Sequence, residues 1–133
     1  MSTKTIRQSV LFSASPHAVF ELLMDQKKHA TFTGCKARVE RKVGGRFSFY
    51  DGDLQGFNLE LVKDKRIIQA WRCVMPHWRK DHYSIVDFAL KKSGKKTKLT
   101  FTHYNVPSGS AKDIAEGWKQ FYWEPMKALL VSK

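Results

Sequence analysis

The chain has 133 residues, a length that suits one compact domain with a sizeable hydrophobic core. Hydrophobic residues make up 42% and charged residues 27%, which excludes a disordered, collagenous or low-complexity chain. The 24 Lys and Arg residues exceed the 12 Asp and Glu residues, and the net charge of +12 is compatible with nucleic acid, anionic membrane or acidic protein partners without assigning one.

We expect no secretory signal and no membrane-spanning segment. No apolar run follows a basic start, and no stretch approaches the roughly 18 apolar residues that a membrane helix requires. Cys35 and Cys73 stand far apart and match no metal or redox spacing, so we expect free thiols in a reducing compartment. We therefore expect a cytoplasmic protein.

The predicted elements begin with a strand and two short helices. Apolar residues alternate over residues 5–12, with Gln8 as the exception on the apolar face. Ser15 and Pro16 then mark the N-cap and the first position of a short helix. A second short helix follows and is expected to end at Gly34.

After the second helix the sequence changes to short strand-like segments separated by turn residues. These segments span residues 35–41, 46–50, 54–62, 66–74, 83–90 and 98–104. Sequential strands with such short links predict an antiparallel meander, because parallel pairs need long crossover connections.

The longest helix is predicted over residues 110–131, where apolar side chains recur at three- and four-residue steps. Ser110 is its expected N-cap, and Pro125 is expected to bend it. One helix can cover such a sheet only if the sheet curls around it, and that geometry offers a cavity between the two. The predicted fold class is therefore α+β, in a single domain that covers residues 1–133.

The standard catalytic and cofactor motifs are absent from the sequence. It contains no nucleophile elbow, no zinc-protease histidine pair, no C-x-x-C and no dinucleotide-binding glycine pattern. His77 and His82 flank Trp78, but two ligands without a third do not define a metal site. We predict no catalytic residues, no metal and no cofactor.

Basic residues gather in three clusters, at residues 36–42, 63–66 and 91–98. The third cluster has five lysines around a predicted hairpin turn and no aromatic residue beside it. Nucleic-acid binding favours aromatic residues interleaved with both Arg and Lys. We expect the charge to serve solubility or to steer an anionic partner, with no specific nucleic-acid binding.

Aromatic residues are the candidates for the wall of a cavity. Trp118 and Tyr122 lie one helical turn apart on the face that meets the sheet, and His103 shares a strand face with apolar neighbours. Plain core packing is the alternative for the aromatic residues, and a hydrogen-bonded structural histidine is the alternative for His103. The predicted ligand-contacting residues are Trp71, His103, Trp118, Tyr122, Phe47 and Tyr83.

Several stretches along the chain match one family in order. They are Ser13-Ala14-Ser15-Pro16, His29-Ala30-Thr31-Phe32-Thr33-Gly34, Gly44-Gly45 with Phe47, Gln69-Ala70-Trp71-Arg72, Val106-Pro107, and Gly117-Trp118 with Tyr122. With these stretches the chain resembles the helix-grip superfamily, which includes START lipid-transfer domains, pollen-allergen-like proteins and polyketide cyclases. Within it, the chain resembles the C-terminal domain of the activator of heat-shock protein 90 ATPase and its stand-alone bacterial relatives.

The resemblance implies a helix-grip fold, in which a curved antiparallel sheet of about six or seven strands wraps one long C-terminal helix. Two short helices follow the first strand. The resemblance also implies a cavity for a small hydrophobic or amphipathic ligand or, as the alternative, a stress-response module that acts on a heat-shock protein 90 type chaperone. A cyclase- or hydrolase-like enzyme ranks third, because no nucleophile–base or metal set is apparent. The expected assembly is a monomer or a homodimer.

Overall fold

A single curved sheet organises the chain in the computed structural model, which describes residues 2–76 and 78–131. Its seven strands are antiparallel and lie in the order β1-β7-β6-β5-β4-β3-β2. Strands β2 to β7 form the predicted meander, and β1 closes the far edge by pairing with β7. The strands are β1 (Thr3–Phe12), β2 (Ala37–Val39), β3 (Arg46–Phe49), β4 (Leu54–Val62), β5 (Arg66–Cys73), β6 (Ser84–Ser93) and β7 (Lys96–Pro107).

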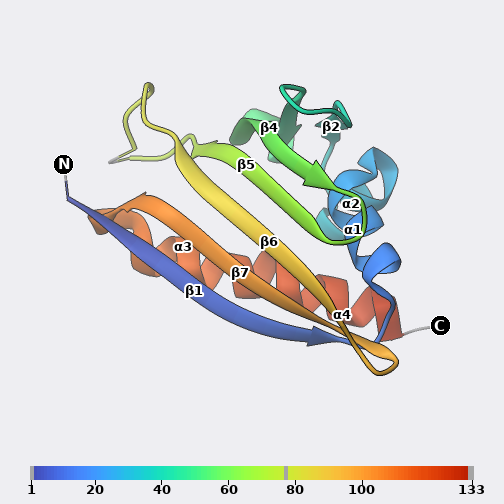
Figure 1. Cartoon of the computed structure of the whole chain (residues 1–133). Coiled ribbons are helices and arrows are strands. Elements are labelled where there is room, and N and C mark those ends of the chain that lie inside the picture. Colours follow the sequence, from blue (N-terminus) through green and yellow to red (C-terminus); the bar gives the residue numbers. More distant parts are fainter. Residues whose placement is uncertain (1, 77, 132–133) are drawn as a thin grey trace.

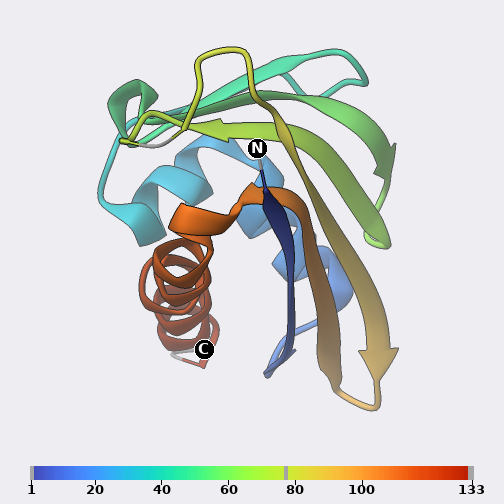
Figure 2. The same cartoon turned by 90° about the vertical axis from the view of Figure 1, so that its left-hand side faces the viewer.

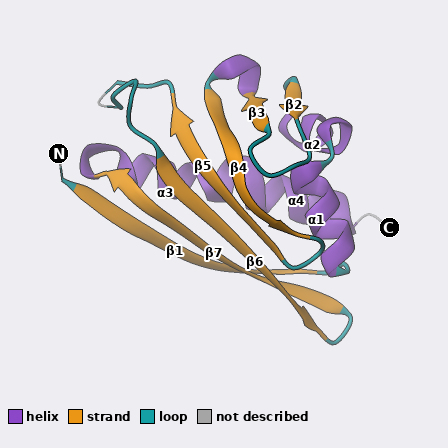
Figure 3. Cartoon of the chain, turned by 45° about the horizontal axis from the view of Figure 1, so that its top comes forward, coloured by secondary structure: helices purple, strands orange, loops and turns teal. Residues whose placement is uncertain are grey.

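The sheet curls around a long C-terminal helix that runs along its inner face (Figures 1 and 2). This rod consists of α3 (Ala111–Trp118), a π-helical segment (Lys119–Trp123) and α4 (Glu124–Val131). The short helices α1 (Pro16–Met24) and α2 (Gln26–Thr33) follow β1 and lie beside α4 (Figure 3). The predicted α+β helix-grip architecture is confirmed.

The signals at the ends of the short helices are also confirmed. The Ser15 side chain accepts a hydrogen bond from the Ala18 N–H at 3.2 Å, and Pro16 opens α1. Gly34 ends α2 in the left-handed conformation with φ of 75°, which glycine adopts at no steric cost.

The predicted cap of the long helix is wrong. Ser110 stands before α3, but its side chain makes no capping hydrogen bond. The reason is local: residues Ser108–Ser110 form a 3₁₀ turn that leads into α3, so the Ser110 backbone is already helical, with φ of −108° and ψ of −9°. A capping side chain instead requires an extended backbone at that position.

A widened helical turn lies just before Pro125. Pro125 has no N–H to donate to the carbonyl of Phe121, one α-helical turn earlier, and the Tyr50 hydroxyl donates to that oxygen at 3.5 Å. Just before it, the Glu124 N–H reaches back five residues to Lys119 O, which is the π-helical pattern. As a result Trp118 and Trp123 stack, with ring centroids 5.6 Å apart and 20° between their planes.

Strands β1, β6 and β7 extend beyond their predicted bounds. Because β6 ends at Ser93 and β7 begins at Lys96, the lysine cluster of residues 91–98 lies at the tip of their hairpin. Gln8, the exception in β1, points inward and tethers the edge strand to the helix. Its Nε2 donates to Ala115 O at 3.0 Å, and its Oε1 accepts from Trp123 Nε1 at 2.6 Å.

Candidate ligand pocket

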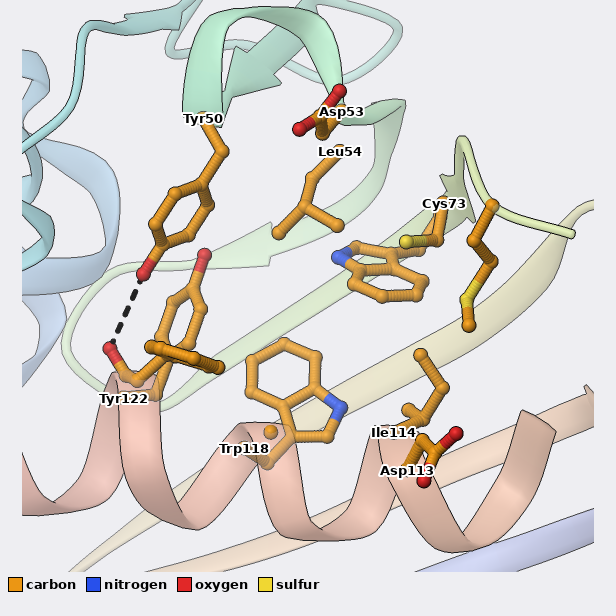
Figure 4. A pocket seen from close by; sticks show the side chains of 12 residues that line it. Tyr50, Asp53, Leu54, Cys73, Asp113, Ile114, Trp118 and Tyr122 are labelled. Carbon is orange, nitrogen blue, oxygen red and sulfur yellow. Dashed lines mark hydrogen bonds between the residues drawn. The ribbon is translucent and has the colours of Figure 1, made fainter.

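A cavity of about 370 Å³ lies between the sheet and the first half of the C-terminal rod (Figure 4). It is lined by Tyr50, Asp53, Leu54, Trp71, Cys73, Met75, Asp113, Ile114, Gly117, Trp118, Phe121 and Tyr122. Apolar atoms form nearly all of its wall. The carboxylates of Asp53 and Asp113 and the ring of Phe121 are exposed and mark its rim.

Regular periodicities place the wall residues. On the helix, Ile114, Trp118 and Tyr122 follow one another at four-residue steps and therefore share one face. On β5, Trp71 and Cys73 are two residues apart and point to the same side of the sheet.

Gly117 helps to keep the cavity open. A Cβ added to Gly117 would meet nothing closer than the Phe121 ring at 3.9 Å, so the missing side chain leaves space that the fold does not otherwise fill.

A chain of hydrogen bonds fixes the Trp118 wall from behind. The Trp118 indole N–H donates to His103 Nδ1 at 3.1 Å. Since Nδ1 accepts, the neutral ring carries its proton on Nε2, which lies 2.8 Å from Ser84 Oγ. Ser84 Oγ in turn donates to Trp71 O at 2.8 Å. Both tryptophans of the wall are thus held by one buried polar network.

His103 is neutral in this network. It is fully buried, and loss of solvation lowers its pKa to about 3. Protonation would also place a second N–H against the Trp118 indole N–H, where only an acceptor fits. The geometry therefore gives His103 a structural role behind the wall; His103 itself does not line the cavity.

His29 supports the opposite end of the wall, and sequence reasoning assigned it no role. It is 1% exposed, it stacks on Phe49 with centroids 3.8 Å apart, and its Nδ1 lies 3.3 Å from Leu23 O. Its Nε2 therefore accepts from the Tyr122 hydroxyl at 3.0 Å. Burial lowers the pKa of His29 to about 4 and raises the pKa of Tyr122 well above its usual value.

The interior behind this wall is nearly solid. A second void, lined by His29 and Gln69 among others, measures only about 10 Å³. That space holds at most about one water molecule. The larger cavity is therefore the space that offers room for a ligand.

The polar groups that face the cavity are few and uncharged at neutral pH, apart from the two rim carboxylates. Burial raises the pKa of the Cys73 thiol to about 11 and of the Tyr50 hydroxyl to about 12. Cys73 is a free cysteine, and its protonated thiol is a poor nucleophile. The wall thus favours binding of an apolar body over covalent chemistry.

The structure separates the six predicted ligand-contacting residues into three groups. Trp71, Trp118 and Tyr122 lie on the cavity wall, and His103 lies one layer behind it. Tyr83 and Phe47 do not line this cavity.

Strand geometry and a missing side chain explain where Tyr83 and Phe47 lie. Tyr83 immediately precedes the buried Ser84, so its ring projects from the opposite face of the sheet, where it contacts Phe57. Phe47 is buried between Phe49 and the backbone of Gly56, because the missing side chain of Gly56 leaves room for its ring.

Metal and membrane sites find no support in the part of the chain that the structure describes. His82 Nε2 bonds to Asn105 O at 2.7 Å, and His77 lies outside the described residues. No group of three or more His, Cys, Asp or Glu side chains gathers within residues 2–76 and 78–131. Over the same residues, no helix is both long and apolar enough to cross a membrane.

The sequence profile of the family described as "Activator of Hsp90 ATPase homolog 1-like protein" matches residues 13–131. The chain belongs to this family. It is 30% identical over 120 residues to the activator of 90 kDa heat shock protein ATPase homolog of Dictyostelium discoideum, which covers 90% of this chain and 31% of that protein. For homolog 1 of Homo sapiens the identity is 26% over 116 residues, covering 87% and 34%. The chain thus spans about a third of the length of these curated relatives.

Solved structures of the family share the fold. The crystal structure of an HSP90 activator from Plasmodium falciparum matches with a TM-score of 0.89 at 25% identity, covering 97% of this chain and 96% of that one. The solution structure of the Aha1 dimer from Colwellia psychrerythraea matches with a TM-score of 0.79 at 19% identity, covering 98% of each chain. The fold inferred from the resemblance is therefore confirmed.

Proposed function

We propose that this chain binds a small, largely apolar ligand in the cavity between the C-terminal helix and the sheet. One observation carries the proposal: about 370 Å³ of space lies within a wall of mostly apolar surface, with two carboxylates at its rim, beside a second void of only about 10 Å³. Ligand pockets in proteins usually have volumes of roughly 300–1,000 Å³ and mostly apolar walls with a few polar groups. Trp71, Trp118 and Tyr122 are the proposed ligand contacts.

The aromatic wall is preorganised to receive such a ligand. Trp118 is fixed by its hydrogen bond to His103, and Tyr122 is fixed by its hydrogen bond to His29. Rigid walls reduce the conformational entropy that binding must otherwise overcome. The wall of the cavity would therefore have its ligand-binding conformation before the ligand binds.

The test fills the cavity without disturbing its wall. Gly117→Leu projects an isobutyl group into the open space, where a Cβ meets only the Phe121 ring at 3.9 Å. The probe is N-phenyl-1-naphthylamine, a neutral apolar dye whose fluorescence rises in apolar surroundings. We expect saturable binding to the wild-type chain and a loss of affinity of about tenfold or more in Gly117→Leu, because the side chain competes for the same volume.

Gly117→Ala is the matched control, since it adds a single methyl group to the same position. It should keep most of the affinity, and thermal melts should show that both variants fold. Unchanged dye affinity in a folded Gly117→Leu variant would contradict the proposed binding site.

A second candidate function is a co-chaperone role on a chaperone of the heat-shock protein 90 type. It is favoured by the likeness to an HSP90 activator along 97% of this chain and by the names of the curated relatives. The proposed contact is electrostatic, through the basic turn between β4 and β5. Lys63 and Lys65 are exposed on this turn and lie away from the cavity.

The chaperone's ATPase rate separates the two candidates. Stimulation by the wild-type chain that survives Gly117→Leu but is lost in the double variant Lys63→Glu, Lys65→Glu would support the co-chaperone role. Rim charges act mainly on association rate and salt dependence, so the double variant should fold normally. No stimulation by the wild-type chain would contradict the co-chaperone role for this chain alone.

A further inference from the structure

The rim of the cavity has a charge opposite to that of the whole chain. Asp53 approaches from the start of β4 and Asp113 from the first turn of α3, on the two sides of the opening (Figure 4). Both are exposed, and neither carboxylate makes an ion pair or hydrogen bond within the described residues. The lining includes no Lys or Arg, although the chain has a net charge of +12.

One hydrogen-bond donor on the wall is also unused. Trp71 is 3% exposed and lines the cavity, and its indole N–H has no acceptor among residues 2–76 and 78–131. The other three indole N–H groups donate to His82 O, His103 Nδ1 and Gln8 Oε1. In the described part of the chain, the side-chain nitrogen and oxygen atoms that are fully buried without a hydrogen-bond partner are Arg72 Nε and Ser110 Oγ. The Trp71 indole nitrogen is not one of them, although it has no partner, so it is not fully buried. It therefore borders open space. Trp71 lines both the large cavity and the second void of about 10 Å³, and of these two only the large cavity has room for a ligand acceptor.

Building on the proposed ligand-binding function, we propose that the ligand is a small amphiphile with an apolar body, a hydrogen-bond acceptor and a cationic end. The apolar body occupies the aromatic part of the cavity, the acceptor receives the Trp71 indole N–H, and the cationic end lies between Asp53 and Asp113 at the opening. A buried donor left unpaired costs free energy, so a ligand that supplies an acceptor is favoured over a plain hydrocarbon. An anionic end would meet two carboxylates and is disfavoured.

The densest cluster of positive charge lies far from the opening. This cluster, at residues 91–98, lies on the β6–β7 hairpin. Trp71 instead pairs with Ser84 at the opposite end of β6. Charges separated by more than about 8 Å are largely screened at physiological ionic strength, so this cluster acts only weakly at the opening.

The experiment uses three probes that share a naphthamide body and differ only in the end group. They are N-(2-aminoethyl)-2-naphthamide, which is cationic, N-propyl-2-naphthamide, which is neutral, and N-(2-naphthoyl)glycine, which is anionic. Titrations follow the indole N–H resonance of Trp71, assigned by its disappearance in Trp71→Phe. We expect the cationic probe to bind about three- to tenfold more tightly than the neutral probe, and the anionic probe to bind most weakly.

Charge-neutralising variants locate the source of this preference. Asp53→Asn and Asp113→Asn should each reduce the advantage of the cationic probe by about threefold, and added salt should reduce it as well. Asp51→Asn and Glu116→Gln are the matched controls, because both positions are exposed and neither lines the cavity. Both controls should keep the wild-type preference.

The outcomes distinguish this inference from the proposed function. Equal affinities for the three probes, or tightest binding of the anionic probe, would overturn the cationic preference while ligand binding in the cavity stands. Probes that bind without shifting the Trp71 resonance would overturn the hydrogen bond to the ligand. Absence of binding by all three naphthamides and by the neutral dye would overturn the proposed function itself.

Discussion

The two halves of the C-terminal rod face the same sheet and produce opposite interiors. At the end of the π-helical segment, Trp123 packs against Phe12, Phe88 and Phe101, with ring centroids 5.1–6.4 Å apart, and on α4 Met126 is completely buried. Along α3, the sheet and the helix leave about 370 Å³ unfilled. The difference shows that a curved sheet gripping one helix does not by itself determine whether the space between them is solid.

Two features of the chain account for the contrast. Helices α1 and α2 lie beside α4 and fill that half with side chains such as Val19, Leu23 and Met24. In the part of the chain that the structure describes, neither short helix packs against α3 in this way, and Gly117 contributes no side chain there. The packed half stabilises the fold, and the open half has room for a ligand.

The largest expected effect comes from removing an anchor of the packed half. Trp123→Ala should lower the free energy of unfolding by about 3–5 kcal/mol, because it empties a filled site and leaves Gln8 Oε1 without its indole donor. Phe121→Ala, at a ring that is 50% exposed on the cavity rim, should cost less than about 1 kcal/mol. Urea unfolding of the two variants measures both values. Similar losses would contradict the division into packed and open halves.

The two buried histidines predict a stability that depends on pH. The pKa is about 3 for His103 and about 4 for His29 in the folded chain, against an ordinary value of 6.5 when unfolded. Below pH 6.5 the unfolded chain therefore binds more protons, so stability is full above that pH and falls as the pH drops. The expected slope approaches about 1.4 kcal/mol per pH unit for each histidine.

Urea unfolding between pH 7.5 and 5 measures this slope above the range in which carboxylates titrate. Arg41 lowers the pKa of Glu21 from 4.5, so that ion pair stabilises the fold throughout this range and changes the slope only at lower pH. His103→Phe should reduce the slope by one proton even if it also lowers stability at pH 7.5. A flat profile in the wild-type chain would show that neither histidine is buried in its neutral form.

Gly56 lies in close contact with packed atoms, so a side chain at this position should destabilise the fold. A Cβ at Gly56 would collide with the Ala70 carbonyl oxygen and lie 2.6 Å from the Phe47 ring, so Gly56→Ala should cost about 1–3 kcal/mol. Gly109→Ala is the control, because nothing lies within 4 Å of the added atom. Thermal melts of the two variants should differ clearly, and equal melting temperatures would contradict the close packing at Gly56.

A glycine beside the cavity should show the smallest effect, with the opposite sign. Gly117→Ala should stabilise the chain by about 0.5–1 kcal/mol, because alanine restricts the unfolded chain and favours the helix while its methyl group enters open space. The measurement is again the free energy of unfolding in urea. A loss of stability would show that the space beside Gly117 is filled in solution.

Most of the fold follows from local patterns in the sequence. Alternation and turn residues predicted β4 with its observed bounds, Leu54–Val62, and Ser15 and Gly34 marked the short helices. The ends of β6 and β7 were predicted too short, because exposed lysines at a hairpin tip have the same polarity as a loop. The Ser110 cap was predicted wrongly because residue type does not reveal a preceding 3₁₀ turn.

The pocket was less predictable, because it joins elements far apart in the sequence. The spacing of Trp118 and Tyr122 indicates a shared helix face. Tyr50 and Asp53 lie opposite that face only because the sheet is curved, and the sequence does not reveal this curvature. His29 lies in a mostly polar helix whose apolar stripe is weak, so its contact with Tyr122 left no periodic signal. Such contacts depend on tertiary packing.

The π-helical segment determines which side of α4 faces the sheet relative to α3. In a regular α-helix, side chains five residues apart point about 140° away from each other, yet Trp118 and Trp123 stack with only 20° between their planes. If the same residues followed the regular α-helical repeat after Trp118, everything beyond this segment would be rotated by about 140°, and Trp123 and Met126 would no longer face the sheet. The boundary between the hollow and the solid interior therefore depends on this one widened turn.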